Sequence, residues 1–208
     1  SNNRGFLNIG NMKKETKIIC GSVLAFLIIL FGIVAIIIHE SPQIQRETHP
    51  TDITVNEFVR QIAPAAQREQ KKYHIPASIT IAQAGLESNW GRSRLANKYN
   101  NLFGIKANSD DEKVQMYTTE NIRGKNVQVK QYFTVYNSWA DSINAHTLLI
   151  VNGTADNHAR FHGVQTAKTY QQAAYELQRN GYATDPDYAS KLIYAIKKFN
   201  LAQYDNVK

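Results

Sequence analysis

The feature that most constrains this chain is an uncharged apolar run over residues 18–38. A run of this kind is long enough to cross a bilayer core, which takes about 20 helical residues. The apolar core of a cleaved signal peptide is shorter, about 7–15 residues, and ends at a small-residue cleavage site. This run ends in three isoleucines followed by His39 and Glu40. We therefore predict an uncleaved transmembrane signal anchor over 18–38.

The charges that flank the run predict its orientation. Three lysines precede it within residues 13–17, and His39 and Glu40 follow it. Because positive flanks stay on the cytoplasmic side, we expect a short cytoplasmic N-terminus over 1–17 and the rest of the chain outside the cell membrane. Residues 39–52 contain two prolines among polar residues and no apolar period, which predicts a linker. The globular domain is then 53–208.

Composition narrows the classes of function. The formal net charge of +7 suits a polyanionic partner such as wall polymer or anionic lipid. No basic run is interleaved with aromatic residues, so we predict no nucleic-acid partner. The single cysteine, Cys20, lies within the apolar run and excludes an intramolecular disulfide.

The first half of the domain has helical periodicity. Apolar residues recur at helical spacing after Val55, which predicts a helix there, with Asn56 as the candidate N-cap. Pro76 fits the first turn of a second helix, over 77–90. Most positions of that second helix are apolar or small, so we expect it to be buried on most sides.

The pattern then changes to strands and back again. Segments 115–119 and 127–133 alternate, are rich in β-branched and aromatic residues, and flank an Arg-Gly-Lys-Asn turn. This predicts a β-hairpin that follows the second helix of the domain. Helical patterns resume over 139–151, 170–180 and 188–200. The expected fold class is α+β and mostly α, with one β-hairpin lobe.

Two carboxylates attract chemical interest. Glu87 lies near the end of the apolar second helix, where loss of hydration would raise its pKa. A carboxylic acid that keeps its proton near neutral pH suits the general acid of a glycosidase. Glu120 lies at the far end of the first hairpin strand, and glycoside hydrolysis commonly uses two carboxylates. By periodicity alone, the pattern favours a solvated surface residue at both positions.

Four segments, taken together, resemble a known family. They are IAQAGLESNWGRS at 81–93, NNLFGIK at 100–106, YFTVYNSWADSI at 132–143 and GYATDPDYA at 181–189. In this order they resemble the motifs of glycoside hydrolase family 73, the bacterial N-acetylglucosaminidases with a lysozyme-like fold and a mannosyl-glycoprotein endo-beta-N-acetylglucosaminidase-like domain. The resemblance covers roughly residues 53–201.

The resemblance implies a lysozyme-like endo-β-N-acetylglucosaminidase that cuts the β-1,4 bond between N-acetylglucosamine and N-acetylmuramic acid in peptidoglycan, without a metal or cofactor. Glu87 matches the family's catalytic acid. Glu120 falls where the family places its second carboxylate, on a mobile hairpin. Some members use the substrate's own N-acetyl group instead, and the sequence leaves both routes open. Tyr182 matches the family tyrosine that faces the cleft and holds the N-acetyl group or the water.

Other residues of these motifs are candidate sugar platforms or walls, because aromatic faces pack against sugars, but each suits an ordinary core equally well. They are Trp90, Asn101, Phe103 and Tyr136. Two helix positions depart from the family's usual Ala and Gly, since this chain has Gly85 and Asn89 there. His158 and His162 are four residues apart, but no third ligand accompanies them, so we predict no metal site.

Two other readings remain open. One is a muramidase or lytic transglycosylase of the same fold, and the other is a non-catalytic wall-binding or scaffold module. In either enzyme reading the substrate is the peptidoglycan glycan strand, reached from a single-pass anchor in the cell membrane with the catalytic domain outside. Proteins of cell-wall synthesis or division are candidate partners.

Overall fold

The computed structural model describes residues 45–122 and 124–206, without the side chains of 120–122. It divides the chain into two units, Ser1–Ile44 and Gln45–Lys208. The predicted cytoplasmic segment, membrane span and first part of the linker lie outside the described residues. Among the residues that are described, no helix has both the length and the apolar character that a membrane span requires.

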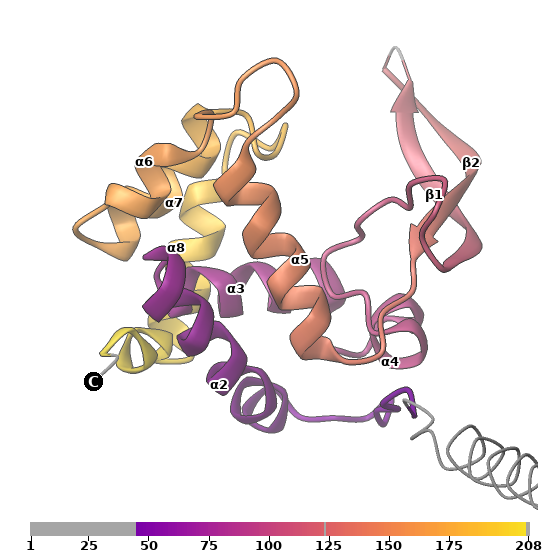
Figure 1. Cartoon of the computed structure of the whole chain (residues 1–208), viewed down its shortest axis with the longest axis horizontal. Helices are drawn as coiled ribbons and strands as arrows, with labels where there is room; N and C mark the ends of the chain where they lie inside the picture. The colour runs from indigo at the N-terminus through magenta and orange to yellow at the C-terminus, as the bar shows by residue number, and fades with distance from the viewer. Residues whose placement is uncertain (1–44, 123, 207–208) are drawn as a thin grey trace, which may run out of the picture. The chain divides into compact units, whose positions relative to one another are not determined.

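The second unit is mostly helical with one antiparallel hairpin, as the sequence predicts (Figure 1). Its elements are α2 (Val55–Tyr73), α3 (Ala77–Ser88), α4 (Arg94–Tyr99), β1 (Lys113–Ile122), β2 (Lys125–Thr134), α5 (Trp139–Asn152), α6 (His162–Thr166), α7 (Tyr170–Arg179), α8 (Tyr188–Lys198) and the 3-10 helix η1 (Leu201–Asp205). Helix α3 is central, in contact with α2, α5, α7, α8 and η1.

The sequence of α3 explains this central place. Ten of its twelve side chains are buried, and the two exceptions, Leu86 and Glu87, lie side by side near its C-terminal end. A helix that is apolar or small all round has no solvent face and packs inside a domain. Helix α3 therefore runs through the core and carries the Glu87 carboxylate where its C-terminal end reaches the surface.

Helix α8 ends at Lys198, two residues before its predicted end, α7 ends one residue early and α5 one residue late. Two further differences have a clear cause. The N-cap of α2 is Thr54, not Asn56, because the Thr54 side chain accepts the Glu57 N–H while the Glu57 carboxylate accepts the Thr54 N–H. Helix α3 ends at Ser88, not at Trp90, because the backbone turns left-handed at Asn89 and stays so through Trp90.

Two short helices were not expected. Helix α4 lies between α3 and the hairpin, so the hairpin follows the third helix of the domain and not the second. Helix α6 is only five residues long. At six and five residues, both are shorter than the window of about 11 residues over which helical periodicity is recognised, which is why periodicity overlooked them.

The described end of the predicted linker is packed on the domain, contrary to the expectation of a free spacer. The backbone N–H of Glu47 donates to the Asn137 carbonyl at 2.7 Å. The ring of His49 stacks on Trp139, with 3.5 Å between centroids and 9° between planes. Residues 47–49 therefore belong structurally to the domain.

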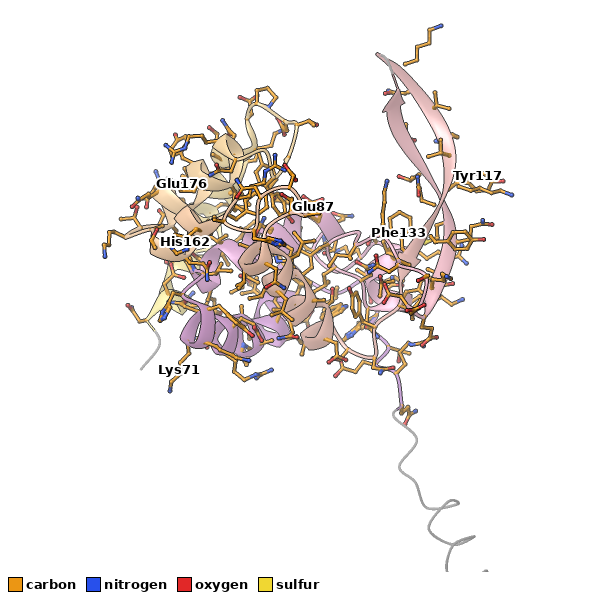
Figure 2. All side chains as sticks on the ribbon, turned by 45° about the horizontal axis from the view of Figure 1, so that its top comes forward. Lys71, Glu87, Tyr117, Phe133, His162 and Glu176 are labelled. Atoms are coloured by element: carbon orange, nitrogen blue, oxygen red, sulfur yellow. The ribbon has the colours of Figure 1, made fainter. Side chains whose placement is uncertain are left out.

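The hairpin has a continuous register from Lys113↔Thr134 to Ile122↔Lys125. Side chains alternate between its two faces. Phe133 is buried, whereas Tyr117 is 67% exposed on the opposite face. Figure 2 shows Phe133 extending toward the helical body and Tyr117 extending away from it.

Candidate active site

Glu87 stands at a sharply defined helix end (Figure 2). Asn89, Trp90 and Gly91 all have positive φ, at 52°, 57° and 81°. Such a conformation is uncommon for residues other than glycine, and here hydrogen bonds hold it. The Trp90 N–H donates to the Gly85 carbonyl at 2.7 Å, and the Gly91 N–H donates to Ser88 Oγ at 2.8 Å. The chain therefore turns away immediately after Glu87.

Gly85 gives the Trp90 ring its space. A Cβ at position 85 would lie 2.6 Å from the indole. The ring also packs edge-on against Phe199 and Phe58, with centroids 4.5 and 6.1 Å apart. This contact explains glycine where the family usually has alanine. Trp90 is partly buried against the core through these contacts, and its role as a sugar platform stays a prediction.

The electrostatics of Glu87 match the expectation from its apolar helix. Desolvation by the surrounding protein raises the pKa of its carboxyl, and no charged neighbour contributes to the shift. The side chain nevertheless remains open to solvent. An acid that retains its proton to higher pH and is accessible from outside can donate that proton to a bound substrate.

Two tyrosines share the surroundings of Glu87. Burial raises the pKa of both the Tyr182 and the Tyr188 hydroxyl, and the negative charge of Glu87 raises both further. Their rings stack with centroids 5.5 Å apart. Gln83, one turn before Glu87 on α3, donates from Nε2 to the Tyr188 hydroxyl at 3.0 Å. The predicted Tyr182 is therefore within electrostatic reach of Glu87.

His146 of α5 completes this group. Its Nε2 lies 2.8 Å from the Tyr182 hydroxyl, and its ring is parallel to Phe103 at 3.8 Å and 8°. Burial lowers the pKa of the imidazole to about 3, so it is neutral at physiological pH. We call Glu87, Gln83, His146, Tyr182 and Tyr188 the Glu87 site. Sequence reasoning missed three of the five: Gln83, His146 and Tyr188.

The remaining predicted sugar contacts differ in how far they are buried and in what they contact. Asn101 is 1% exposed, and its amide binds the backbone of Ile105 and Thr134, so it clamps the hairpin base and presents no wall to a sugar. Phe103 is 9% exposed and offers its face to His146 instead. Tyr136 lines a pocket of about 370 Å³ between the hairpin base and α5.

Glu120 can be placed by its backbone alone. It pairs with Val127 near the tip of the hairpin, and its side chain lies outside the described atoms. Strand alternation assigns position 120 to the same face as Val114, whose partner is Phe133, and to the face opposite Tyr117. Position 120 therefore belongs to the hairpin face that carries the buried Phe133.

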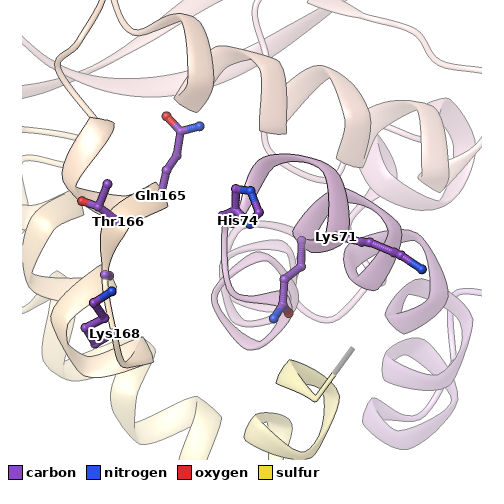
Figure 3. Close-up of a pocket in the computed structure, with 7 residues that line it drawn as sticks. Lys71, His74, Gln165, Thr166 and Lys168 are labelled. Carbon is purple, nitrogen blue, oxygen red and sulfur yellow. The ribbon is translucent and has the colours of Figure 1, made fainter. Parts of the chain in front are cut away.

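A larger pocket lies elsewhere. It has a volume of about 520 Å³ between the C-terminal end of α2 and the segment after α6, and Figure 3 shows His74 facing Gln165, Thr166 and Lys168 across it. Its lining contains no carboxylate and no predicted site residue. It therefore offers no carboxyl group of the kind that glycoside hydrolysis commonly uses.

The geometry can be set beside known proteins. A family model described as mannosyl-glycoprotein endo-beta-N-acetylglucosaminidase matches residues 63–201. The chain belongs to this glucosaminidase family. It is accordingly a glycoside hydrolase, and the resemblance noted in the sequence is confirmed.

Relatives and solved structures agree with this assignment. The exo-glucosaminidase LytG of Bacillus subtilis is 38% identical over 94% of this chain and 69% of its own length. A probable N-acetylmuramidase of Lactococcus lactis is 37% identical over 79% of this chain, which spans only 37% of that protein. The catalytic domain of the autolysin Auto from Listeria monocytogenes has a TM-score of 0.69 and 38% identity, over 76% of this chain and 90% of its own.

Proposed function

We propose that this glucosaminidase hydrolyses the β-1,4 bond between N-acetylglucosamine and N-acetylmuramic acid inside peptidoglycan glycan strands. Family membership supplies the class of bond, and relatives described as autolysin and peptidoglycan hydrolase support the polymer. The observation that carries the proposal is Glu87, an accessible carboxylic acid with a raised pKa on an otherwise buried helix.

In the proposed reaction, the Glu87 carboxylic acid gives its proton to the glycosidic oxygen as the bond from that oxygen to the anomeric carbon breaks. The positive charge that develops on the sugar is stabilised from the other face. Water then adds its hydroxide to the anomeric carbon, and its remaining proton passes to a base. One water is consumed, and a reducing N-acetylglucosamine end is released.

Two groups are candidates to stabilise this positive charge from the face of the sugar opposite Glu87. One is the Glu120 carboxylate, whose backbone position pairs with Val127 in the hairpin. The other is the acetamido group of the substrate, which needs no second carboxylate as nucleophile. We assign Tyr182 to that acetamido group; the electrostatic effect of Glu87 on its hydroxyl and its hydrogen bond with His146 support the assignment.

The bond is tested by identifying the new chain ends. Purified peptidoglycan is digested with the protein, reduced with borohydride and analysed by mass spectrometry. The proposal expects reduced N-acetylglucosamine ends on long fragments at early times. Release of single sugars from strand ends would indicate exo-action, as the name of LytG describes. Reduced muramic ends would indicate a muramidase, and anhydro-muramic ends a transglycosylase; each would overturn the proposed bond.

We propose further that residues 18–38 anchor the enzyme in the cell membrane, with residues 1–17 cytoplasmic and the domain outside. The apolar run and its flanking lysines support this. The likeness to LytG covers more of the chain than the 45–208 unit, so it reaches into the N-terminal segment. Because residues 47–49 are packed on the domain, few residues separate it from the span.

This placement would confine cutting to wall near the membrane, where proteins of cell-wall synthesis or division would be accessible partners. Fractionation of cells and protease treatment of intact protoplasts test it. The proposal expects the protein in the membrane fraction and its domain digested from outside. A protein that is released into the medium with its N-terminus removed after the apolar run would contradict it.

A further inference from the structure

We propose that His146 is a positioning residue that turns Tyr182 into a hydrogen-bond donor toward the substrate. In this arrangement the Nε2–H of His146 donates to the Tyr182 hydroxyl oxygen, and the Tyr182 proton is left for an acceptor in the Glu87 site. The inference rests on the proposed function, because it assigns the acceptor as the carbonyl oxygen of a 2-acetamido sugar.

The geometry holds both rings in place. His146 is 1% exposed, and the parallel Phe103 ring fixes the imidazole plane. Tyr182 is wedged between Tyr188 and the edge of Phe161, with centroids 5.5 and 5.9 Å away. The 2.8 Å separation between His146 Nε2 and the Tyr182 hydroxyl is a full hydrogen bond. A single proton lies between these two atoms. If it is bonded to His146 Nε2, the Tyr182 hydroxyl accepts this hydrogen bond and keeps its own proton to donate elsewhere.

The burial of His146 and the lack of a hydrogen-bond partner at one of its nitrogens determine which atom carries this proton. A neutral imidazole has one N–H and one bare nitrogen. Among the described residues, Nδ1 of His146 is buried without a hydrogen-bond partner. Placing the proton there would bury an orphaned N–H, which is rarer in proteins than an unfilled acceptor. The proton therefore belongs on Nε2, where it has the tyrosine oxygen as its acceptor.

The direction of the tyrosine proton follows. With its oxygen already accepting from His146, the Tyr182 hydroxyl has to donate elsewhere. The side chain is only partly buried, and the charge of Glu87 acts on it. In the complex, the acetamido carbonyl of the sugar is the acceptor, and this hydrogen bond orients the sugar for proton transfer from Glu87.

A double-mutant cycle tests the coupling. His146→Phe keeps the stack on Phe103 but removes the donor, and Tyr182→Phe removes the hydroxyl. Loss of one hydrogen bond predicts a roughly tenfold fall in kcat/KM for each. The double variant should be no worse than either single variant, because both remove the same interaction. His146→Gln, whose amide can donate to the tyrosine, should recover part of the loss. His162→Phe, on the exposed start of α6, is the matched control and should leave kcat/KM unchanged.

Two results would overturn the inference. Additive losses in the double variant would show that His146 acts independently of Tyr182. A second test needs no variant to be active: nitrogen NMR of the full chain labelled at histidine, in which His146 should show a protonated Nε2 and a bare Nδ1. The opposite tautomer would refute the inference. Failure of the proposed function can be told apart from failure of this inference. An active Glu87→Gln enzyme would refute the proposed function and would leave the His146 tautomer unchanged.

Discussion

Helix α3 and the β1–β2 hairpin each carry one of the two predicted carboxylates, and they are held in very different ways. Helix α3 is in contact with five other elements, and ten of its twelve side chains are buried. The hairpin strands form a two-stranded sheet that is bridged to Lys106 at Phe133, and in β2 only Phe133 and Thr134, at its base, are buried. A two-stranded sheet alone is marginally stable in water. The acid is therefore fixed by the core, whereas position 120 depends on the hairpin ladder.

The largest expected effect is on the helix. Glu87→Gln removes the proton donor and preserves shape, so kcat should fall by about 10³-fold. The rate of release of reducing ends from purified wall measures it, with thermal denaturation as a control for folding. Activity within a few-fold of wild type would show that the acid lies elsewhere.

A smaller effect is expected on the hairpin. Glu120→Gln should lower kcat roughly tenfold, less than the full contribution of a catalytic carboxylate, because the substrate's acetamido group can serve on the same face. Its melting temperature should match that of wild type, since the position is near the exposed tip. A loss equal to that of Glu87→Gln would remove the distinction between the two regions and make Glu120 indispensable.

Two glycine substitutions compare the stability of the same regions. Gly85→Ala drives a Cβ into the Trp90 ring at 2.6 Å, and such overpacking typically costs about 1–3 kcal/mol. Gly124→Ala meets no atom within 4 Å but must keep φ near +80°, at a cost of roughly 1 kcal/mol. Chemical denaturation should show the larger loss for Gly85→Ala, accompanied by reduced activity. Equal losses would contradict the picture of a tightly packed helix end.

The smallest effect is on the pH dependence of stability. The folded-state pKa of Glu87 is raised, so its favourable contribution is complete below the unfolded value and is lost as pH rises through the folded value. Glu87→Gln does not titrate. Its melting temperature should equal that of wild type below about pH 4 and exceed it modestly near neutrality. A variant less stable than wild type at neutral pH would show that the Glu87 carboxylate is stabilised and not desolvated.

Much of this arrangement could be predicted from local pattern. The buried helix, the hairpin and Glu87 follow from periodicity, alternation and one carboxylate among apolar neighbours. Their boundaries did not follow as well: α3 ends early because Trp90 folds back on Gly85, a contact that no propensity encodes. Residues 47–49 looked like linker because their partners, such as Trp139, lie far away in the sequence.

The site residues that sequence reasoning missed also depend on contacts between residues far apart in the sequence. His146 reaches Tyr182 across 36 residues, and Gln83 reaches Tyr188 across 105. Nothing in the sequence near His146 marks it, because its role depends on α5 packing beside Phe103. Asn101 was a candidate sugar contact because its residue type suits sugars, yet its side chain is buried and its amide binds the backbone of the hairpin base. Tertiary contacts, and not residue type, decide whether a residue contacts the substrate or only holds the site in place.

The most direct test of the central claim is the pH dependence of kcat/KM for wild type and Glu120→Gln, measured side by side. If the core-held Glu87 is the acid, both enzymes lose activity as pH rises, along one alkaline limb whose apparent pKa lies above the ordinary glutamate value of 4.5. If the alkaline limb disappears or moves when Glu120 is replaced, the essential proton resides on the hairpin, and the account given for helix α3 is wrong.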